Sequence, residues 1–362
     1  MIPEKLKQID ESIIQLLSDR LSILAESGVP NIEEQLAYVA PLLAQLSVPE
    51  NIWANHATMS SLAALSAKQA QNNQNNHNHN HPSRKITIIG GRGRMGQFFT
   101  QHLSAAGHQV SVVGSQDWEN ASILGEADLV LVSVPIEHTV HIIKRAAKYL
   151  APTTALADIT SIKAEPVEAM LEQHSGPVMG LHPMFGPSVQ SFSGQKVVVC
   201  SGRNDEEFQW LLDFMHSQGA LLISCTPQEH DSMMVIVQAT QHFSRFSFGV
   251  FLATESFDVE RSLTMSSPSY RQEIEIVNRL FAQNPTLCVD IMLATEERSQ
   301  TIERLANTYS RLAQLVVNKD REGLIQEFVA AQSFFTKQTS NLKSSNYTKR
   351  ESVTPPLEAT HK

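Results

Sequence analysis

The chain has 362 residues, three cysteines and a formal net charge of -9. That length allows two or three domains, and the acidic balance argues against nucleic acid or an anionic membrane as a partner. With no apolar run of spanning length, no signal-peptide pattern and too few cysteines for a disulfide framework or zinc site, we expect a cytoplasmic protein without a metal.

The first predicted element is an amphipathic helix near the N-terminus. Its seam, at alternating steps of three and four residues, consists of Leu6, Ile9, Ile13, Leu16, Arg20 and Ile23. We expect this seam to be buried. An arginine on a buried seam either reaches the surface or binds an anion, and the pattern leaves both open. Pro30, Pro41 and Pro49 then divide the next stretch of chain into short helices, and we place this helical domain at residues 1–66.

Residues 67–83 are rich in asparagine and histidine. Such a segment buries too little apolar surface to offset the entropy lost on ordering, so we expect a flexible linker. Its alternating histidines, His77, His79 and His81, are interpreted as incidental rather than as metal ligands.

A strand, a glycine-rich loop and a helix come after the linker. Lys85–Ile89 is mostly β-branched, and Gly91, Gly93 and Gly96 have the spacing G-x-G-x-x-G. In this motif the first glycine permits a tight turn, the second lets the backbone approach a pyrophosphate, and the third lets the helix pack closely on the strand. A second strand at Gln109–Val113 completes the pattern, which predicts a dinucleotide site.

Alternating strands and helices predict a doubly wound α/β domain over residues 84–226. Its further strands are expected at Leu129–Val134, Ala155–Asp158, Val178–Leu181, Lys196–Cys200 and Ala220–Ser224. Residues 227–338 show only helical periodicity, at His230–Ala253, Ser269–Ala282, Leu287–Asn318 and Arg321–Gln338. These helices are apolar on more than one face, which suits a dimerisation domain. Residues 339–362 are polar, and we expect a disordered tail.

The residues themselves suggest a base for oxidation of a hydroxyl group. Histidine suits that task near neutral pH, and His182 comes after a short predicted strand, where a loop would present it to the crevice. Ser161, at the end of another strand, could fix its tautomer by a hydrogen bond. A purely structural His-Pro turn is the other interpretation. On the helices, His242 and Arg279 could close over an anionic substrate, although a solvated or interface charge is the commoner role of a helical arginine.

Several longer motifs resemble prephenate dehydrogenase, specifically the dehydrogenase half of the bacterial bifunctional chorismate mutase–prephenate dehydrogenases. They are Gly90–Gly96, Val132–Pro135, Gly180–Pro187, Ser266–Arg271 and Asn278–Gln283. The resemblance covers about Lys85 to Gln338. It implies a Rossmann-like domain followed by an all-α dimerisation domain.

The resemblance also implies roles for single residues. The histidine matching His182 accepts the proton of the ring hydroxyl, the serine matching Ser161 orients it, and the arginine matching Arg279 binds the ring carboxylate. The other expected substrate-binding residues are His242, Gln238 and Arg271, and the expected cofactor-binding residues are Gly91, Arg92, Gly93, Arg94, Met95, Gly96, Gly114, Ser133 and Pro135. The implied reaction is oxidative decarboxylation of prephenate to 4-hydroxyphenylpyruvate in tyrosine biosynthesis. A homodimer, and inhibition by tyrosine at the same pocket, are implied as well.

The N-terminal helices resemble the chorismate mutase domain of the same enzymes in a reduced form. Arg20 matches an active-site arginine, but Pro3 and Asn31 stand where the family has further cations. A dianionic transition state held by one cation loses much of its stabilisation, so we expect little mutase activity.

Three other functions compete with this one. An arogenate dehydrogenase differs only in the substrate side chain, but the sequence offers no clear acidic partner for an ammonium group. A non-catalytic, tyrosine-sensing regulatory subunit would not need His182, Ser161 and Arg279 together. A generic β-hydroxy-acid dehydrogenase would usually need a catalytic lysine in the helical domain, where no convincing candidate stands.

The choice of cofactor is where the sequence departs from the family. Gly114 comes directly after the second strand, where an NAD site normally has an acidic residue that binds the adenosine ribose. Its absence removes the repulsion of a 2′-phosphate, for which Ser115, Arg92 and Arg94 are candidate ligands. Alternatively, Asp117 reaches back to the ribose. We expect NAD to be slightly preferred, with NADP as the alternative and with weak discrimination.

Overall fold

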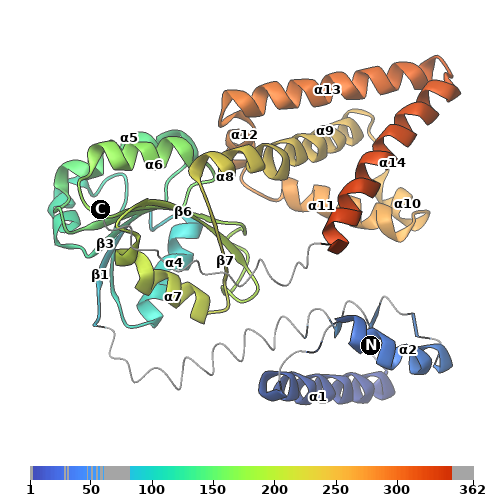
Figure 1. The fold of residues 1–362 in the computed structure, drawn as a ribbon, viewed down its shortest axis with the longest axis horizontal. Helices are drawn as coiled ribbons and strands as arrows, with labels where there is room; N and C mark the ends of the chain where they lie inside the picture. The colour runs from blue at the N-terminus through green and yellow to red at the C-terminus, as the bar shows by residue number, and fades with distance from the viewer. Residues whose placement is uncertain are drawn as a thin grey trace. The chain divides into compact units, whose positions relative to one another are not determined.

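The computed structural model describes residues 3–27, 30, 32–46, 48–49, 52–53, 56–57, 60 and 82–344. From residue 82 onwards the described chain forms two units, here called the sheet unit and the helical unit (Figure 1). The helical unit begins at Thr226, and it also includes Pro135–Thr139 and Ser161–Ala164. The sequence had placed both short segments in the dinucleotide-binding domain. No helix in the described part is long and apolar enough to cross a membrane.

The sheet unit is built on seven strands. They are β1 (Lys85–Ile89), β2 (Gln109–Val113), β3 (Leu129–Val132), β4 (Ala155–Asp158), β5 (Val178–Pro183), β6 (Lys196–Arg203) and β7 (Leu221–Cys225), in the order β2-β1-β3-β4-β5-β6-β7. The first five strands are parallel, whereas β6 runs antiparallel to β5 and parallel to β7. The inner strands β3, β4 and β5 are buried throughout, which explains why the sequence shows them as continuous apolar runs.

Helices cover both faces of the sheet. On one face, α4 (Arg94–Ala105) and α7 (Gln209–Ser217) contribute Phe99 and Leu211 to the core. On the other, the 3-10 helix η1 (Trp118–Glu126), α5 (Ile136–Ala146) and α6 (Ala164–Gln173) contribute Leu124, Ile143 and Met170 (Figure 1). Short 3-10 turns follow α5 and precede α7, as η2 (Ala147–Tyr149) and η3 (Asp205–Phe208). This is the doubly wound arrangement that the sequence predicted.

The helical unit begins with one long, continuous helix. It consists of α8 (Pro227–Met234), a π-helical turn η4 (Val235–Thr240) and α9 (Gln241–Thr254). Thr226 caps α8, Ser267 caps α11 (Pro268–Phe281) and Asn284 caps α12 (Pro285–Leu293). In each case a proline occupies the first turn, so the combination of cap and proline fixes where the helix starts.

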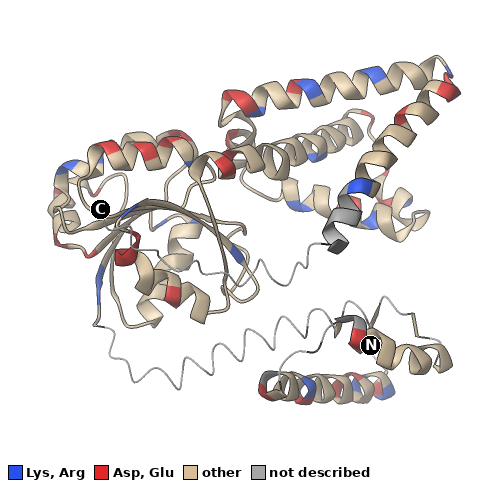
Figure 2. Cartoon of the chain, viewed as in Figure 1, with Lys and Arg blue, Asp and Glu red and all other residues tan. Residues whose placement is uncertain are grey.

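Three predictions about the helices need correction. The helix expected at Leu287–Asn318 is interrupted, because Thr295 caps a new helix, α13 (Glu296–Val317), by accepting the Arg298 N–H at 3.3 Å. The short helix α10 (Val259–Thr264) was missed. Helix α14 (Arg321–Ser344) continues into the segment expected to be a disordered tail, and residues 345–362 lie outside the described part. Acidic and basic side chains are interspersed along these helices (Figure 2).

The N-terminal helices are α1 (Glu4–Ser27) and α2 (Ile32–Gln45), and Pro41 lies inside α2 rather than ending it. The apolar residues of the predicted seam, Leu6 to Ile23, are 45–66% exposed, so the expectation that this seam is buried was wrong. The covered face is shifted from this seam by one residue and consists of Leu17, Leu21 and Leu24, together with Arg20, the one seam residue that is half-buried. The Arg20 guanidinium donates to Gln35 Oε1 and lies 5.4 Å from the centre of the Trp53 ring. Asn31 and linker residues 67–81 lie outside the described residues.

Candidate active site

The loop after β1 turns at Gly90, one residue earlier than the motif suggests. Gly90 has φ +82°, and a Cβ there would lie 2.1 Å from the Ser133 carbonyl oxygen. Gly91 is needed for a different reason, because its Cβ would lie 2.7 Å from Val112 Cγ2 on β2. The tight turn that was expected at Gly91 is therefore made by Gly90, where only glycine adopts this backbone without strain.

The two later glycines lie in close quarters around the Gly90 carbonyl oxygen. A Cβ on Gly96 would lie 2.5 Å from the Gly90 carbonyl oxygen, so α4 packs directly on the loop. A Cβ on Gly93 would meet only that oxygen, at 3.2 Å. Gly93 is the N-cap of α4 and has no side chain, which leaves the first N–H groups of the helix accessible to an anion. This loop lies where β2 and β3 flank β1 on opposite sides, the usual position of a pyrophosphate in a doubly wound sheet.

Three residues meet where β2 ends. Asp117 Oδ2 accepts the Gly114 N–H at 2.7 Å and contacts Arg92 Nη2 at 2.9 Å. The Gly114 N–H and, to a smaller extent, the Arg92 guanidinium hold the pKa of Asp117 below its usual range. Arg92 and Gly114, two of the predicted cofactor-binding residues, thus lie together, whereas Arg94 is exposed at the start of α4.

The remaining predicted cofactor-binding residues fall in different places. Met95 packs against the core under the sheet. Ser133 continues the pairing of β3 with β1, because its N–H donates to the Ile89 carbonyl at 2.8 Å. Pro135 is exposed and belongs to one of the two short segments of the helical unit.

His182 lies in a strand rather than in the predicted loop. It is the penultimate residue of β5, in register with Val198 of β6, and is 3% exposed. Strand β4 ends at Asp158 opposite Gly180, so the last residues of β5 pair with β6 alone. The antiparallel β6 therefore extends β5 past the carboxyl end of β4. A paired strand fixes a functional side chain more accurately than a loop.

The segment Ser161–Ala164 is held by two side chains of the helical unit. Asp231, on α8, accepts the backbone N–H groups of Lys163 and Ala164, each at 2.8 Å. Arg298, on α13, donates from Nη2 to the Ser161 carbonyl at 3.1 Å and from Nη1 to the Ile291 carbonyl at 2.7 Å. These bonds connect the candidate catalytic serine to the helices, and neither Asp231 nor Arg298 was predicted from the sequence.

Both holding residues are unusual in their electrostatics. Burial raises the pKa of Asp231, but hydrogen bonds from His230 Nδ1, at 2.7 Å, and from the two backbone N–H groups outweigh it, so the pKa is lowered. Arg298 is fully buried, and burial lowers its pKa although the Asp231 charge opposes this. Within the described residues, Arg298 Nε has no hydrogen-bond partner. Burying a guanidinium with an unused donor costs free energy, so stability alone does not explain Arg298. We interpret it as a residue that positions the Ser161 backbone.

The predicted substrate-binding residues of the helical unit lie on two helices. His242 Nδ1 lies 2.9 Å from the Gln238 carbonyl oxygen. Because a carbonyl only accepts, Nδ1 carries the hydrogen and Nε2 of the neutral ring is the acceptor. Burial lowers the pKa of His242, and the positive charges of Arg245 and Arg298 add to this effect against the opposing bond to Gln238. On α11, Arg271 Nη2 donates to the Leu263 carbonyl at 2.7 Å, and Arg279 is exposed.

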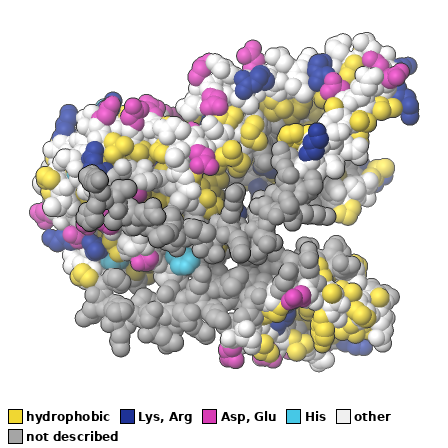
Figure 3. Space-filling view, viewed as in Figure 1, with side chains coloured by type: hydrophobic (Ala, Val, Ile, Leu, Met, Phe, Trp, Pro, Cys, Tyr) yellow, Lys and Arg dark blue, Asp and Glu magenta, His cyan; other side chains and the backbone are white. Residues whose placement is uncertain are grey.

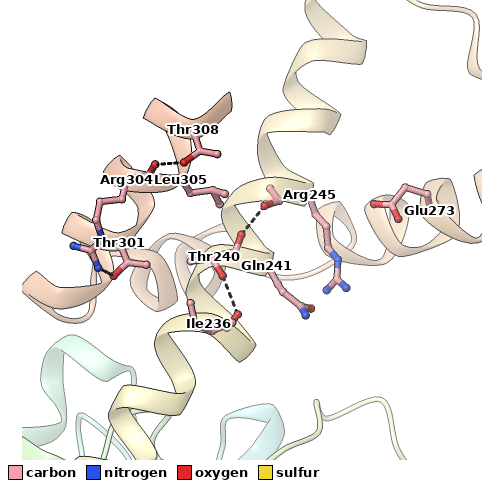
Figure 4. Close-up of a pocket in the computed structure, with 10 residues that line it drawn as sticks. Ile236, Thr240, Gln241, Arg245, Glu273, Thr301, Arg304, Leu305 and Thr308 are labelled. Carbon is pink, nitrogen blue, oxygen red and sulfur yellow. Dashed lines mark hydrogen bonds between the residues drawn. The ribbon is translucent and has the colours of Figure 1, made fainter. Parts of the chain in front are cut away.

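A separate, open pocket of about 440 Å³ lies among η4, α9, α11 and α13. Figure 4 shows its lining side chains, which include Arg245, Glu273 and Arg304. Arg304 Nη2 donates to Thr301 Oγ1 at 2.6 Å. None of the predicted substrate-binding residues lines this pocket, so the sequence motifs do not explain it.

Two family models match the chain in order. The prephenate dehydrogenase nucleotide-binding domain matches residues 100–224, and the prephenate dehydrogenase dimerization domain matches residues 226–330. The T-protein of Haemophilus influenzae is 41% identical over 257 residues, which cover 71% of this chain and 68% of the relative. The T-protein of Enterobacter agglomerans is 32% identical over 345 residues, 92% of this chain and 91% of the relative. The chain belongs to the prephenate dehydrogenase family.

A solved structure of the prephenate dehydrogenase family has the same fold. The enzyme from A. aeolicus, in complex with hydroxyphenyl propionate and NAD+, superposes with a TM-score of 0.53 at 17% identity and covers 71% of this chain and 98% of that one. The first family model begins at residue 100, beyond the glycine loop. For this member of the prephenate dehydrogenase family, the assignment of the loop therefore depends on the geometry at Gly90, Gly93 and Gly96 described above.

Proposed function

We propose that the protein is a prephenate dehydrogenase that uses NAD. The observation that carries this is the match of both prephenate dehydrogenase domains, in order, on a chain whose glycine loop is shaped for a pyrophosphate. NAD supplies the hydride acceptor when bound. Loss of carbon dioxide from the oxidised ring gives an aromatic product, 4-hydroxyphenylpyruvate, and makes the reaction effectively irreversible.

The chain's own residues bind the substrate and move one proton. His182 takes the proton of the ring hydroxyl, a task that requires a neutral imidazole near pH 7. Ser161 orients that imidazole. Its backbone is held in one position because Arg298 donates to the Ser161 carbonyl and Asp231 accepts the N–H groups of the residues that follow. Gln238 and His242 line the substrate pocket, and Arg279 binds the ring carboxylate. The exposure of Arg279 supports its role, because an exposed guanidinium is accessible to a carboxylate of the substrate.

A turnover assay tests the function directly. Purified protein is supplied with prephenate or arogenate and with NAD+ or NADP+, and reduced cofactor and carbon dioxide are measured. We expect prephenate with NAD+ to give the highest kcat/KM. Faster turnover of arogenate would replace this function by that of an arogenate dehydrogenase, and no turnover with either substrate would support the regulatory alternative.

Arg279→Gln should raise KM for prephenate by about tenfold to a hundredfold, the scale of one lost charge-assisted contact. The effect on kcat should be small, because a contact made equally in the ground and transition states changes only binding. Steady-state kinetics measure the split. Arg261→Gln, an exposed arginine on α10, serves as the matched control and should leave both constants unchanged.

The N-terminal domain is proposed to be a mutase remnant. Deletion of residues 1–80 should leave prephenate oxidation within about twofold, because the dehydrogenase units have their own cores. The full chain should convert chorismate to prephenate no faster than the uncatalysed reaction. Rapid formation of prephenate, measured as the loss of chorismate absorbance, would contradict this proposal. Loss of dehydrogenase activity on deletion would contradict it as well.

Dimerisation through the helical unit is part of the proposal. Apolar side chains stay exposed on its last two helices, and hydrophobic atoms gather on the visible face of these helices (Figure 3). They include Val316, Val317, Phe328 and Phe334, each at least 58% exposed. A second copy would cover this surface.

Tyrosine resembles the product in its ring and carboxylate, so it should compete with prephenate at the same pocket.

A further inference from the structure

The end of β2 lies directly beside the phosphate-binding loop. The Gly90 N–H donates to the Val113 carbonyl at 2.8 Å, so Gly114 is the first residue past the strand that borders the loop. In a doubly wound domain, the adenosine ribose of a dinucleotide lies at this strand end when its pyrophosphate is over the loop. A carboxylate here accepts a hydrogen bond from the ribose 2′-hydroxyl, whereas an arginine accommodates a 2′-phosphate.

The chain has a carboxylate at this position, although its strand-end residue is glycine. The backbone turns at Gly114, where the Asp117 N–H donates to the Gly114 carbonyl at 3.2 Å, and the Asp117 side chain folds back onto the Gly114 N–H at 2.7 Å. The two bonds to the carboxylate both use Oδ2. The side chain remains 28% exposed, so the carboxylate is open to a ligand hydroxyl.

Glycine at position 114 leaves room for the Arg92 guanidinium. A Cβ at this position would lie 2.6 Å from Arg92 Nη1 and 3.1 Å from Asp117 Oδ2. Any other residue here, including the acidic residue usual in NAD sites, would shift the end of the Arg92 side chain from its present place beside Asp117. The acidic group missing at residue 114 is thus replaced by the Asp117 carboxylate, which reaches the same place from three residues further along the chain.

We infer that Asp117 selects NAD by binding the ribose 2′-hydroxyl, and that Arg92, which it neutralises, is a latent anchor for the 2′-phosphate of NADP. With Asp117 ionised, a 2′-phosphate meets a negative charge at the strand end and is rejected. Without that charge, Arg92 is released for a charge-assisted contact with phosphate. This favours the second of the two alternatives at Gly114 and predicts clearer discrimination than the missing strand-end acid suggested.

Binding measurements on the full chain test this inference, which rests on the proposed function only in that the loop binds a nicotinamide dinucleotide. Calorimetry gives Kd for NAD+ and NADP+, and for 5′-AMP and adenosine 2′,5′-bisphosphate, which lack the nicotinamide. The unaltered protein should bind NADP+ at least about tenfold more weakly than NAD+. In Asp117→Asn, NAD+ should weaken about tenfold and NADP+ should tighten about tenfold, a hundredfold change in their ratio.

Two further variants separate the roles. The double variant Asp117→Asn with Arg92→Gln should lose the gained affinity for NADP+ and for the bisphosphate. Glu119→Gln, an exposed acid two residues away, should leave every Kd unchanged. Asp117→Ser should repeat the shift in ratio, so that one unstable variant does not decide the outcome.

Equal affinity of the unaltered protein for both cofactors, or an unchanged ratio in both Asp117 variants, would overturn the inference. Failure of the proposed function has a different signature: NAD+ binds with the expected preference, but prephenate is not oxidised.

Discussion

Replacement of His182 by asparagine is expected to lower kcat for prephenate oxidation by about a hundredfold or more, the usual scale for loss of a general base. Asparagine keeps a polar side chain of similar size, but it cannot take a proton at neutral pH. The unchanged backbone of β5, held by β6, should keep the substrate site intact, so KM should change much less. Steady-state kinetics and a circular dichroism spectrum of the variant provide the measurement.

The matched control is His216→Asn, which alters an exposed histidine on α7. It should leave kcat and KM unchanged. The pH profile adds a second readout, because the acidic limb of kcat in the unaltered enzyme should be absent from the residual activity of the His182 variant. A His182 variant with full kcat would show that another group removes the proton.

Asp231→Asn is expected to lower the free energy of unfolding by about 2–4 kcal/mol and to reduce kcat as well. An amide presents one acceptor oxygen where the carboxylate now accepts both N–H groups of Lys163 and Ala164, so one buried donor loses its partner. Loosening that segment also frees Ser161, which should lower kcat more than it raises KM. Urea unfolding and steady-state kinetics measure the two effects, and Glu229→Gln, an exposed acid on the same helix, is the control.

The stabilisation by Asp231 should depend on pH in a defined direction. The folded-state pKa of Asp231 is lowered, so the folded protein binds this proton less readily than the unfolded chain does. The contribution is fully present above the ordinary aspartate pKa of about 3.9 and is lost as the pH falls through the lower folded-state value. The difference in stability between the native protein and Asp231→Asn should therefore shrink on acidification below about pH 4. A difference that is constant with pH would contradict an ionised Asp231.

The sequence predicted the fold well where local signals are strong. The glycine spacing and the β-branched runs identified β1 and β2 with their observed limits, although β1 is buried from its second residue onwards and β2 is a half-buried edge strand. The limits of β5 were wrong by two residues, since its last residues are strand only because antiparallel β6 pairs with them. The exposed seam of α1 was misjudged because two faces of that helix carry apolar residues, and periodicity does not tell which one is covered.

The candidate site was predictable only in part. His182 and Arg279 stand in motifs long enough to be recognised, and Ser161 was found at the end of a predicted strand. Asp231 and Arg298, in contrast, act through backbone groups far away in sequence. An arginine after the cap residue Thr295 looks like any solvated charge in a first helical turn. The relocated carboxylate at Asp117 was noted only as an alternative, because its position depends on a turn that spacing alone does not reveal.

The π-helical turn Val235–Thr240 sets the rotational phase between the two ends of its helix. Each α-helical residue advances the side-chain direction by about 100°, and a wider turn accommodates one additional residue without breaking the helix. Asp231 lies before this turn and His242 after it, so their relative directions differ from those in an uninterrupted α-helix. The wide turn thus adds an angular offset: one end of the helix directs Asp231 to its backbone hydrogen bonds, and the direction of His242, a proposed substrate-binding residue, is set independently at the other end.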